Sequence, residues 1–265
     1  GGNYKSHGPQ YVRGIQEGNG IPEDGDLWLS YSVNKEDMWV SRIQVPVQLE
    51  ATAHAKDDFS QAEKLADLTD WNLYSPLWAP VSLEGKWLKM SDRDPFDYCR
   101  IERKIPASKE LKVAFDIKAD QNDKGLLQIE FLDENSIACA RIDLNPDGTM
   151  LSKGGARYGK LLNYEAGKSY HVEVILSVSK RMSEVFIDGK KAGQRMFFAP
   201  VAAIERIAFR TGERRTFPTI DTPADWDGTL ADAGEQEPLV AYSIANFQTS
   251  STDVSASAAV LNYNN

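Results

Sequence analysis

Apolar and polar residues alternate along most of this 265-residue chain. The segments LKVAFDIKAD (111–120) and LLQIEFLDE (126–134) are the clearest cases, with an apolar residue at nearly every second position. A period of two predicts half-buried strands, and Pro-Asp-Gly at 146–148 predicts a tight turn. About ten short strands of this kind predict an all-β fold over 73–250, an antiparallel jelly-roll β-sandwich. The missing helical patterns exclude a parallel α/β architecture.

The segment DGDLWLSYSVNKEDMWVSRIQVPV (24–47) has two apolar ribbons around a polar turn. This pattern predicts a β-hairpin. An isolated hairpin is marginally stable in water, so we expect most of its sheet to lie outside this chain. The hairpin itself is then expected to pack on the sandwich or on another molecule. Trp28 and Trp39 are the side chains of most interest for this packing.

The chain therefore divides into four predicted parts. Residues 1–47 hold the hairpin element, 73–250 the sandwich and 251–265 a polar tail. Residues 48–72 are predicted to be a linker, in which Phe59, Ala62, Leu65, Ala66 and Leu68 suit a short helix with Asp57 or Asp58 as its N-cap. The long loop 216–238 is predicted to be either functional or mobile.

Charge and cysteine content narrow the classes of function. A net charge of −9 and a pI near 5.0 argue against nucleic acid and anionic membranes as partners. The sequence has no run of about 18 apolar residues, so no membrane-spanning helix is predicted. The start GGNYKSHG lacks the basic and apolar regions of a signal peptide. Cys99 and Cys139 each lie in a predicted strand, as buried free thiols or as a single bridge between neighbouring strands.

Two resemblances to known families follow from particular segments. KSYHVEVILSVSKRMSEVFIDGKKAG (168–193) and AYSIANFQTS (241–250) resemble the concanavalin-A-like, laminin-G-like jelly roll of bacterial carbohydrate-active proteins. Residues 7–47 look like the closing portion of a sialidase-type six-bladed β-propeller, although its Asp-box is not matched and no internal repeat is present. The resemblance implies a secreted, periplasmic or cell-surface bacterial protein of glycoside-hydrolase type, of which this chain keeps only the tail of the propeller.

The sequence contains few of the residue patterns that catalysis requires. Glycoside hydrolysis usually needs two carboxylates, and the Glu-x-Asp-x-x-Glu pattern of jelly-roll glucanases is absent. Glu102 and Glu130 are predicted to be solvated surface charges, and His171 a sheet-face residue. No zinc spacing or Gly-x-Ser-x-Gly elbow occurs. These observations favour a non-enzymatic chain.

Sugar binding needs aromatic faces and a few polar groups. Trp71 and Trp78 are predicted to pack the linker onto the sandwich. Trp226, in the acidic long loop, suits a ligand-facing tip. The other candidate ligand-binding residues are three arginines suited to bidentate contacts with acidic sugars, or to offsetting nearby acids, and one histidine of the propeller-like part: Arg210, Arg214, Arg215 and His7.

The same loop offers oxygen ligands for a structural calcium ion, from Asp221, Asp225 and Asp227. The sequence therefore predicts a carbohydrate-binding or accessory module for polysaccharide or oligosaccharide, whose missing propeller belongs to the same polypeptide. Two alternatives stay open. One is a glycoside hydrolase, active alone or with that propeller. The other is a structural or oligomerising domain without a ligand.

Overall fold

A computed structural model of the chain describes residues 9–15, 26–33, 37–44, 51–95, 98–212 and 236–251. The chain separates into two compact units, one holding the strands before residue 51 and the other the strands after it. Each unit is described by itself. Within the described ranges no helix is long and apolar enough to cross a membrane.

The first unit is a three-stranded antiparallel sheet. Its strands, in the order β1-β2-β3, are β1 (Pro9–Ile15), β2 (Asp26–Val33) and β3 (Asp37–Gln44). The expected hairpin is present as β2 and β3, paired from Asp26↔Gln44 to Val33↔Asp37. Strand β1 was not expected, because PQYVRGI carries a proline and a glycine that weaken the strand pattern. The side chains of Trp28 and Trp39 lie outside the described ones.

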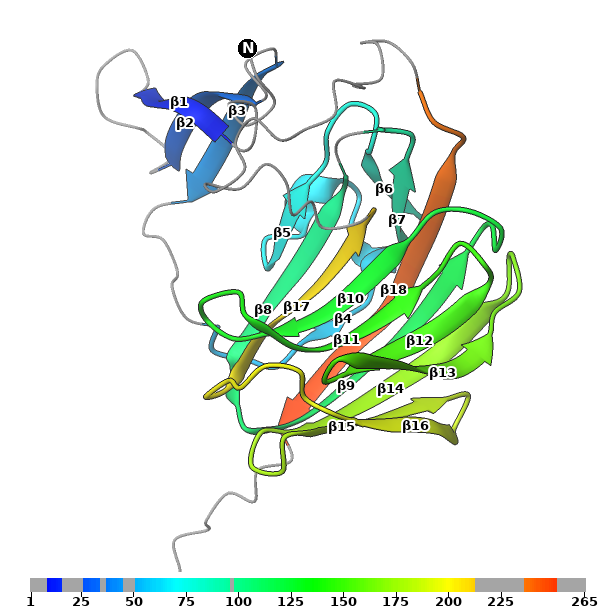
Figure 1. Cartoon of the computed structure of the whole chain (residues 1–265). Helices are drawn as coiled ribbons and strands as arrows, with labels where there is room; N and C mark the ends of the chain where they lie inside the picture. Colours follow the sequence, from blue (N-terminus) through cyan, green and yellow to red (C-terminus); the bar gives the residue numbers. More distant parts are fainter. Residues whose placement is uncertain are drawn as a thin grey trace, which may run out of the picture. The chain divides into compact units, whose positions relative to one another are not determined.

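The second unit is a sandwich of two antiparallel sheets (Figure 1). The seven-stranded sheet has the order β13-β12-β11-β10-β17-β8-β5. Its strands are β5 (Trp71–Tyr74), β8 (Arg100–Ser108), β10 (Leu127–Leu132), β11 (Ala138–Leu144), β12 (Thr149–Gly154), β13 (Arg157–Asn163) and β17 (Ile204–Thr211). The predicted all-β jelly-roll sandwich is confirmed.

The eight-stranded sheet has the order β16-β15-β14-β9-β18-β7-β6, with β4 also paired to β18. Its strands are β4 (Lys56–Asp57), β6 (Val81–Glu84), β7 (Trp87–Asp92), β9 (Glu110–Ala119), β14 (Ser169–Ser177), β15 (Met182–Ile187), β16 (Lys190–Met196) and β18 (Val240–Ser251). The two sheets bury their apolar faces against each other.

The core follows the alternation seen in the sequence. Every second residue of β9 is buried, and the ring of Phe115 packs edge-on against Phe209 at 5.1 Å between centroids. Cys99 and Cys139 are both buried and free, so the alternative of a bridge is wrong. Burial raises the pKa of the Cys139 thiol to about 12, which keeps it in its unreactive protonated form.

The segment expected as a linker belongs partly to the sandwich. In place of a helix it forms two single turns of 3₁₀ helix, η2 (Phe59–Gln61) and η3 (Leu65–Asp67). Asp58 caps the first by accepting a hydrogen bond from the Ser60 amide. The expected packing of Trp71 is confirmed, since this residue is buried with its ring 5.0 Å from that of Phe247.

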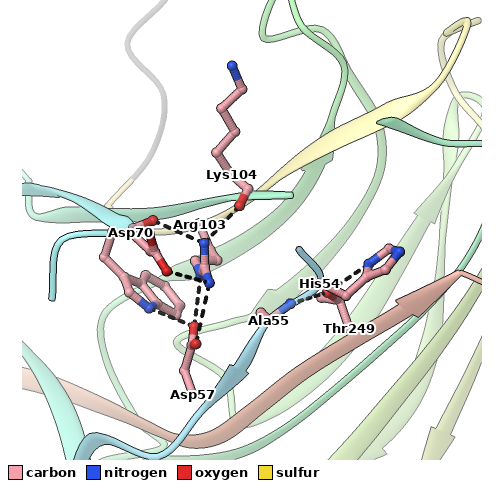
Figure 2. A network of polar contacts seen from close by, with 8 residues as sticks. His54, Ala55, Asp57, Asp70, Arg103, Lys104 and Thr249 are labelled. Carbon is pink, nitrogen blue, oxygen red and sulfur yellow. Dashed lines mark hydrogen bonds and ion pairs between the residues drawn. The ribbon is translucent and has the colours of Figure 1, made fainter. Parts of the chain in front are cut away.

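A polar cluster fixes this segment to the sandwich (Figure 2). Arg103 of β8 donates from Nε to Asp57 Oδ2 at 2.8 Å and from Nη2 to Asp70 Oδ2 at 3.0 Å. Trp71 Nε1 donates to the same Asp57 oxygen at 2.9 Å. We name these four residues the Arg103 clasp. Because β4 pairs with β18 while Arg103 lies in β8, the clasp joins the two sheets.

Candidate functional site

The outer face of the seven-stranded sheet carries the side chains that alternate with the core positions. Described cations on this face outnumber the carboxylates, although the whole chain is acidic. The cations are Arg100, Lys104, Arg141, Lys153, Lys160, Arg206 and Arg210, and the carboxylates are Glu102, Glu130 and Asp143. A polar face of this kind is suited to a ligand that carries hydroxyl groups and negative charge.

One charged cluster on this face is centred on Glu102 of β8. The residue is only 2% exposed, so its prediction as a surface charge is wrong. Arg100 Nη2 lies 2.5 Å from its Oε2, and Arg206 Nη1 lies 3.3 Å from its Oε1. Two arginines from neighbouring strands thus compensate the carboxylate, which explains how it is tolerated in a buried position.

A second cluster is centred on Arg141 of β11. Its Nε lies 3.0 Å from Asp143 Oδ1, and its Nη1 lies 3.8 Å from Glu130 Oε1. Glu130 points away from the core as expected, but it is only 8% exposed, so its prediction as a solvated residue is wrong. Burial raises the pKa of the Asp143 carboxyl to about 6, with Arg141 opposing the shift and Glu130 adding to it.

Cations oppose each other directly across β17 and β8. Arg210 pairs with Arg100, and Arg206 pairs with Lys104 in the ladder. Like charges directly opposite on adjacent strands destabilise a sheet unless an anion lies between them, and Glu102 is such an anion for Arg100 and Arg206. Two buried polar atoms of this face, Arg206 Nε and Gln128 Oε1, also have no hydrogen-bond partner among the described residues. Such groups are costly to bury unless a ligand or water satisfies them.

Tyrosine rings lie at both ends of the charged clusters. The Arg210 guanidinium lies 3.9 Å from the centroid of the Tyr98 ring, and Tyr98 lies 5.4 Å from Tyr74. At the other end the Tyr158 hydroxyl accepts a hydrogen bond from Arg141, and its side chain is half exposed. We name the whole set the arginine–tyrosine face: Tyr74, Tyr98, Arg100, Glu102, Gln128, Glu130, Arg141, Asp143, Tyr158, Arg206 and Arg210.

Of the candidate residues taken from the sequence, only Arg210 lies within the described part of the chain, and it belongs to this face. The others lie outside the described residues: His7, Arg214, Arg215, Asp221, Asp225, Trp226 and Asp227. The predicted calcium site therefore lies there too, and among the described residues no group of three or more potential metal ligands occurs. Sequence reasoning missed Tyr98, Tyr158 and Arg206, whose positions depend on strand pairing.

The raised pKa of Asp143 predicts a particular pH dependence of stability. Between about pH 4 and 6 the unfolded chain has released this proton while the folded chain keeps it, so stability falls as pH rises through that window. We expect Asp143→Asn to remove up to about 2–3 kcal/mol of this fall. Urea unfolding from pH 4 to 8 measures it. Asp147→Asn, at an exposed carboxyl with a lowered pKa, is the control, and parallel curves for wild type and Asp143→Asn would contradict the assignment.

The fold is that of a β-sandwich carbohydrate-binding module. The chain belongs to the sialidase-like CBM family, because residues 71–226, more than half of its length, match the family described as "Sialidase-like, CBM domain". Its function is that of a carbohydrate-binding accessory module. No curated protein matches the chain.

Two solved structures show how the chain relates to other proteins. A structure named "Sialidase" is 70% identical, with a TM-score of 0.89, and the match covers 96% of this chain but 23% of that one. The chain thus spans about a quarter of that protein's length. A structure titled "Prominent members of the human gut microbiota express endo-acting O-glycanases to initiate mucin breakdown" is 13% identical, with a TM-score of 0.52 over 74% of this chain and 97% of the other. That second likeness concerns the fold alone.

Proposed function

We propose that the arginine–tyrosine face is the glycan-binding surface of this module and that its ligand is an acidic glycan. The observation that carries the proposal is the excess of cations over carboxylates on this face, where Arg210 lies opposite Arg100 and Arg206 opposite Lys104 in the ladder. A sugar carboxylate placed there accepts hydrogen bonds from guanidinium groups on both strands, in the geometry that arginine favours.

The tyrosines supply the apolar part of the same surface. A pyranose ring has an apolar side that stacks on an aromatic ring, while its hydroxyls bond to polar neighbours. Tyr98 is adjacent to both Arg210 and Tyr74, and Tyr158 is adjacent to Arg141. The face therefore offers ring contacts at both ends and charged contacts between them, which suits more than one sugar unit.

We further propose that the module serves a longer, secreted or cell-surface bacterial protein that cleaves glycans, with the catalytic residues outside this chain. The 70% identity to a stretch of a sialidase supports this. The antiparallel β1-β2-β3 sheet supports the origin of residues 1–47 in a propeller, because propeller blades are antiparallel sheets of four strands. The module then holds the larger protein on its polysaccharide.

The test is titration calorimetry with a sialylated oligosaccharide, a uronic-acid oligosaccharide and a neutral oligosaccharide. We expect binding of an acidic ligand that weakens at high salt, and Arg206→Met to weaken it at least tenfold, about 1.4 kcal/mol. Arg157→Met, which removes an exposed arginine of β13 outside the face, is the matched control and leaves the affinity unchanged. Equal affinities of the two variants, or a preference for the neutral ligand, would overturn the proposal.

One observation bears on the alternative of a hydrolase. Glu130 and Asp143 both contact Arg141, and Asp143 has a raised pKa, as a general acid requires. Both carboxylates are buried and share one guanidinium, whereas a glycosidase pair must flank the scissile bond. We therefore expect this chain to release no reducing sugar from the ligands it binds, and release abolished by Glu130→Gln would support the hydrolase instead.

A further inference from the structure

The outer face of the eight-stranded sheet has a hollow centred on a small residue. Three central strands line it, β14, β9 and β18, and its volume is about 240 Å³. Ala114 forms the floor, with Glu173 and Gln248 opposite it on the two neighbouring strands. We name it the Ala114 hollow, lined by Lys112, Ala114, His171, Glu173, Gln248, Thr249 and Ser250.

A β-bulge shapes the wall formed by β18. The ladder with β9 shifts by one residue between Ala245 and Gln248, and Asn246 has a φ of 51°, in the left-handed region. Asn adopts this conformation more readily than most residues with a side chain, and β-bulges are common next to functional sites. The bulge places Asn246 so that its Nδ2 donates to Asp116 Oδ2 at 2.6 Å.

The polar groups of the hollow are held in fixed positions. Asp116 Oδ1 lies 2.7 Å from His171 Nδ1, which orients the imidazole, and His171 Nε2 lies 3.9 Å from Glu173 Oε1. Lys112 Nζ lies 2.5 Å from that same Glu173 oxygen. Gln248 is exposed, and the ion pairs of Glu173 with Lys112 and His171 both involve its Oε1, so Gln248 and the second carboxylate oxygen of Glu173 face a ligand placed in the hollow.

We propose that the Ala114 hollow is a second ligand site, separate from the arginine–tyrosine face, for one neutral sugar residue. Its volume is below the roughly 300–1,000 Å³ typical of sites for drug-sized ligands, so it suits a single ring. The pair of Lys112 and Glu173 offers a donor beside an acceptor, which matches two vicinal hydroxyls, one accepting and one donating. Two carboxylates, Asp116 and Glu173, face one lysine here, which disfavours an acidic sugar.

The two sites differ in how they recognise a sugar. No Phe, Tyr or Trp lines the hollow, so hydrogen bonds carry the recognition there, and we expect millimolar affinity. The site goes beyond the proposed function, because it lies on the other sheet and is selective for neutral rather than acidic sugars.

The experiment records backbone amide chemical shifts of the ¹⁵N-labelled chain with methyl glycosides of galactose, glucose, mannose and N-acetylglucosamine at tens of millimolar. We expect at least one of them to shift residues 112–116, 171–175 and 246–250. Ala114→Leu fills the hollow and abolishes the shifts, and Glu173→Gln weakens binding at least tenfold. Glu184→Gln, at an equivalent Glu–Lys ion pair on the same sheet outside the hollow, leaves binding unchanged.

The failure of this inference is distinguishable from failure of the proposed function. If none of the four glycosides shifts these residues, or if Ala114→Leu and Glu184→Gln bind equally well, the second site is excluded. Arg206→Met, measured with the same glycosides, leaves the hollow unaffected. A loss of both neutral and acidic binding in Arg206→Met alone would place all recognition on the other sheet and also overturn the inference.

Discussion

Phe247→Ala is expected to lower the free energy of unfolding by about 3–5 kcal/mol, the range for removing a fully buried aromatic ring. The residue is 0% exposed. Its ring centroid lies 5.0 Å from that of Trp71 and 6.2 Å from that of Phe209, so it contacts both the N-terminal segment of the sandwich and the opposite sheet. The substitution leaves a cavity at the point where β4, β5 and β17 meet β18.

Urea unfolding followed by tryptophan fluorescence measures the loss, and Trp71 reports on the site itself. The matched control is Leu77→Ala, an apolar truncation at a residue that is 85% exposed, for which we expect a change within about 0.5 kcal/mol. A loss of less than about 1 kcal/mol for Phe247→Ala would show that its surroundings collapse onto the cavity or that the ring is not packed as described.

Arg103→Met is expected to cost about 2–4 kcal/mol. It keeps most of the aliphatic stem and removes the hydrogen bonds that Arg103 donates to Asp57 and Asp70, while the bond from Trp71 to Asp57 remains. Breaking a buried ion pair usually costs about 3–5 kcal/mol because the remaining charge is left uncompensated. The lower figure here reflects that the Asp57 side chain is 20% exposed and the Asp70 side chain 65%.

Two further variants separate this effect from an ordinary loss of charge. Lys191→Met breaks an exposed pair with Glu184, for which about 0–1 kcal/mol is expected. Asp57→Asn in the Arg103→Met background restores part of the loss, since it removes the carboxylate that the first change left unpaired. If Arg103→Met and Lys191→Met cost the same, the clasp contributes no more than a surface pair.

Much of the fold was predictable because one face of each sheet is buried. The alternation in 111–120 gave the inward face of β9 correctly, and all four of its apolar positions there are in the core. The short helix in 48–72 was wrong because tertiary contacts override local preference. Lys56 and Asp57 pair with β18, and Phe59 is buried, so the chain has room for single 3₁₀ turns only.

The candidate site was much less predictable. Glu102 and Arg206 lie 104 residues apart in sequence and meet only because β17 pairs with β8. The same pairing places Arg210 beside Tyr98, whereas alternation alone shows only that such residues leave the core. The rule that the outer face is solvated failed for Glu102 and Glu130 because long arginine side chains of the neighbouring strands lie against them.

Strand β18 has a consequence for how the chain folds as it leaves the ribosome. It is the last described strand, yet it lies inside the eight-stranded sheet, between β9 and β7. Until residues 240–251 emerge, β9 and β7 each present an open edge, and such edges pair readily with other chains. The contacts that close the sheet also span more than a hundred residues, which slows folding. The nascent chain therefore stays open to aggregation until residues 240–251 have been synthesised.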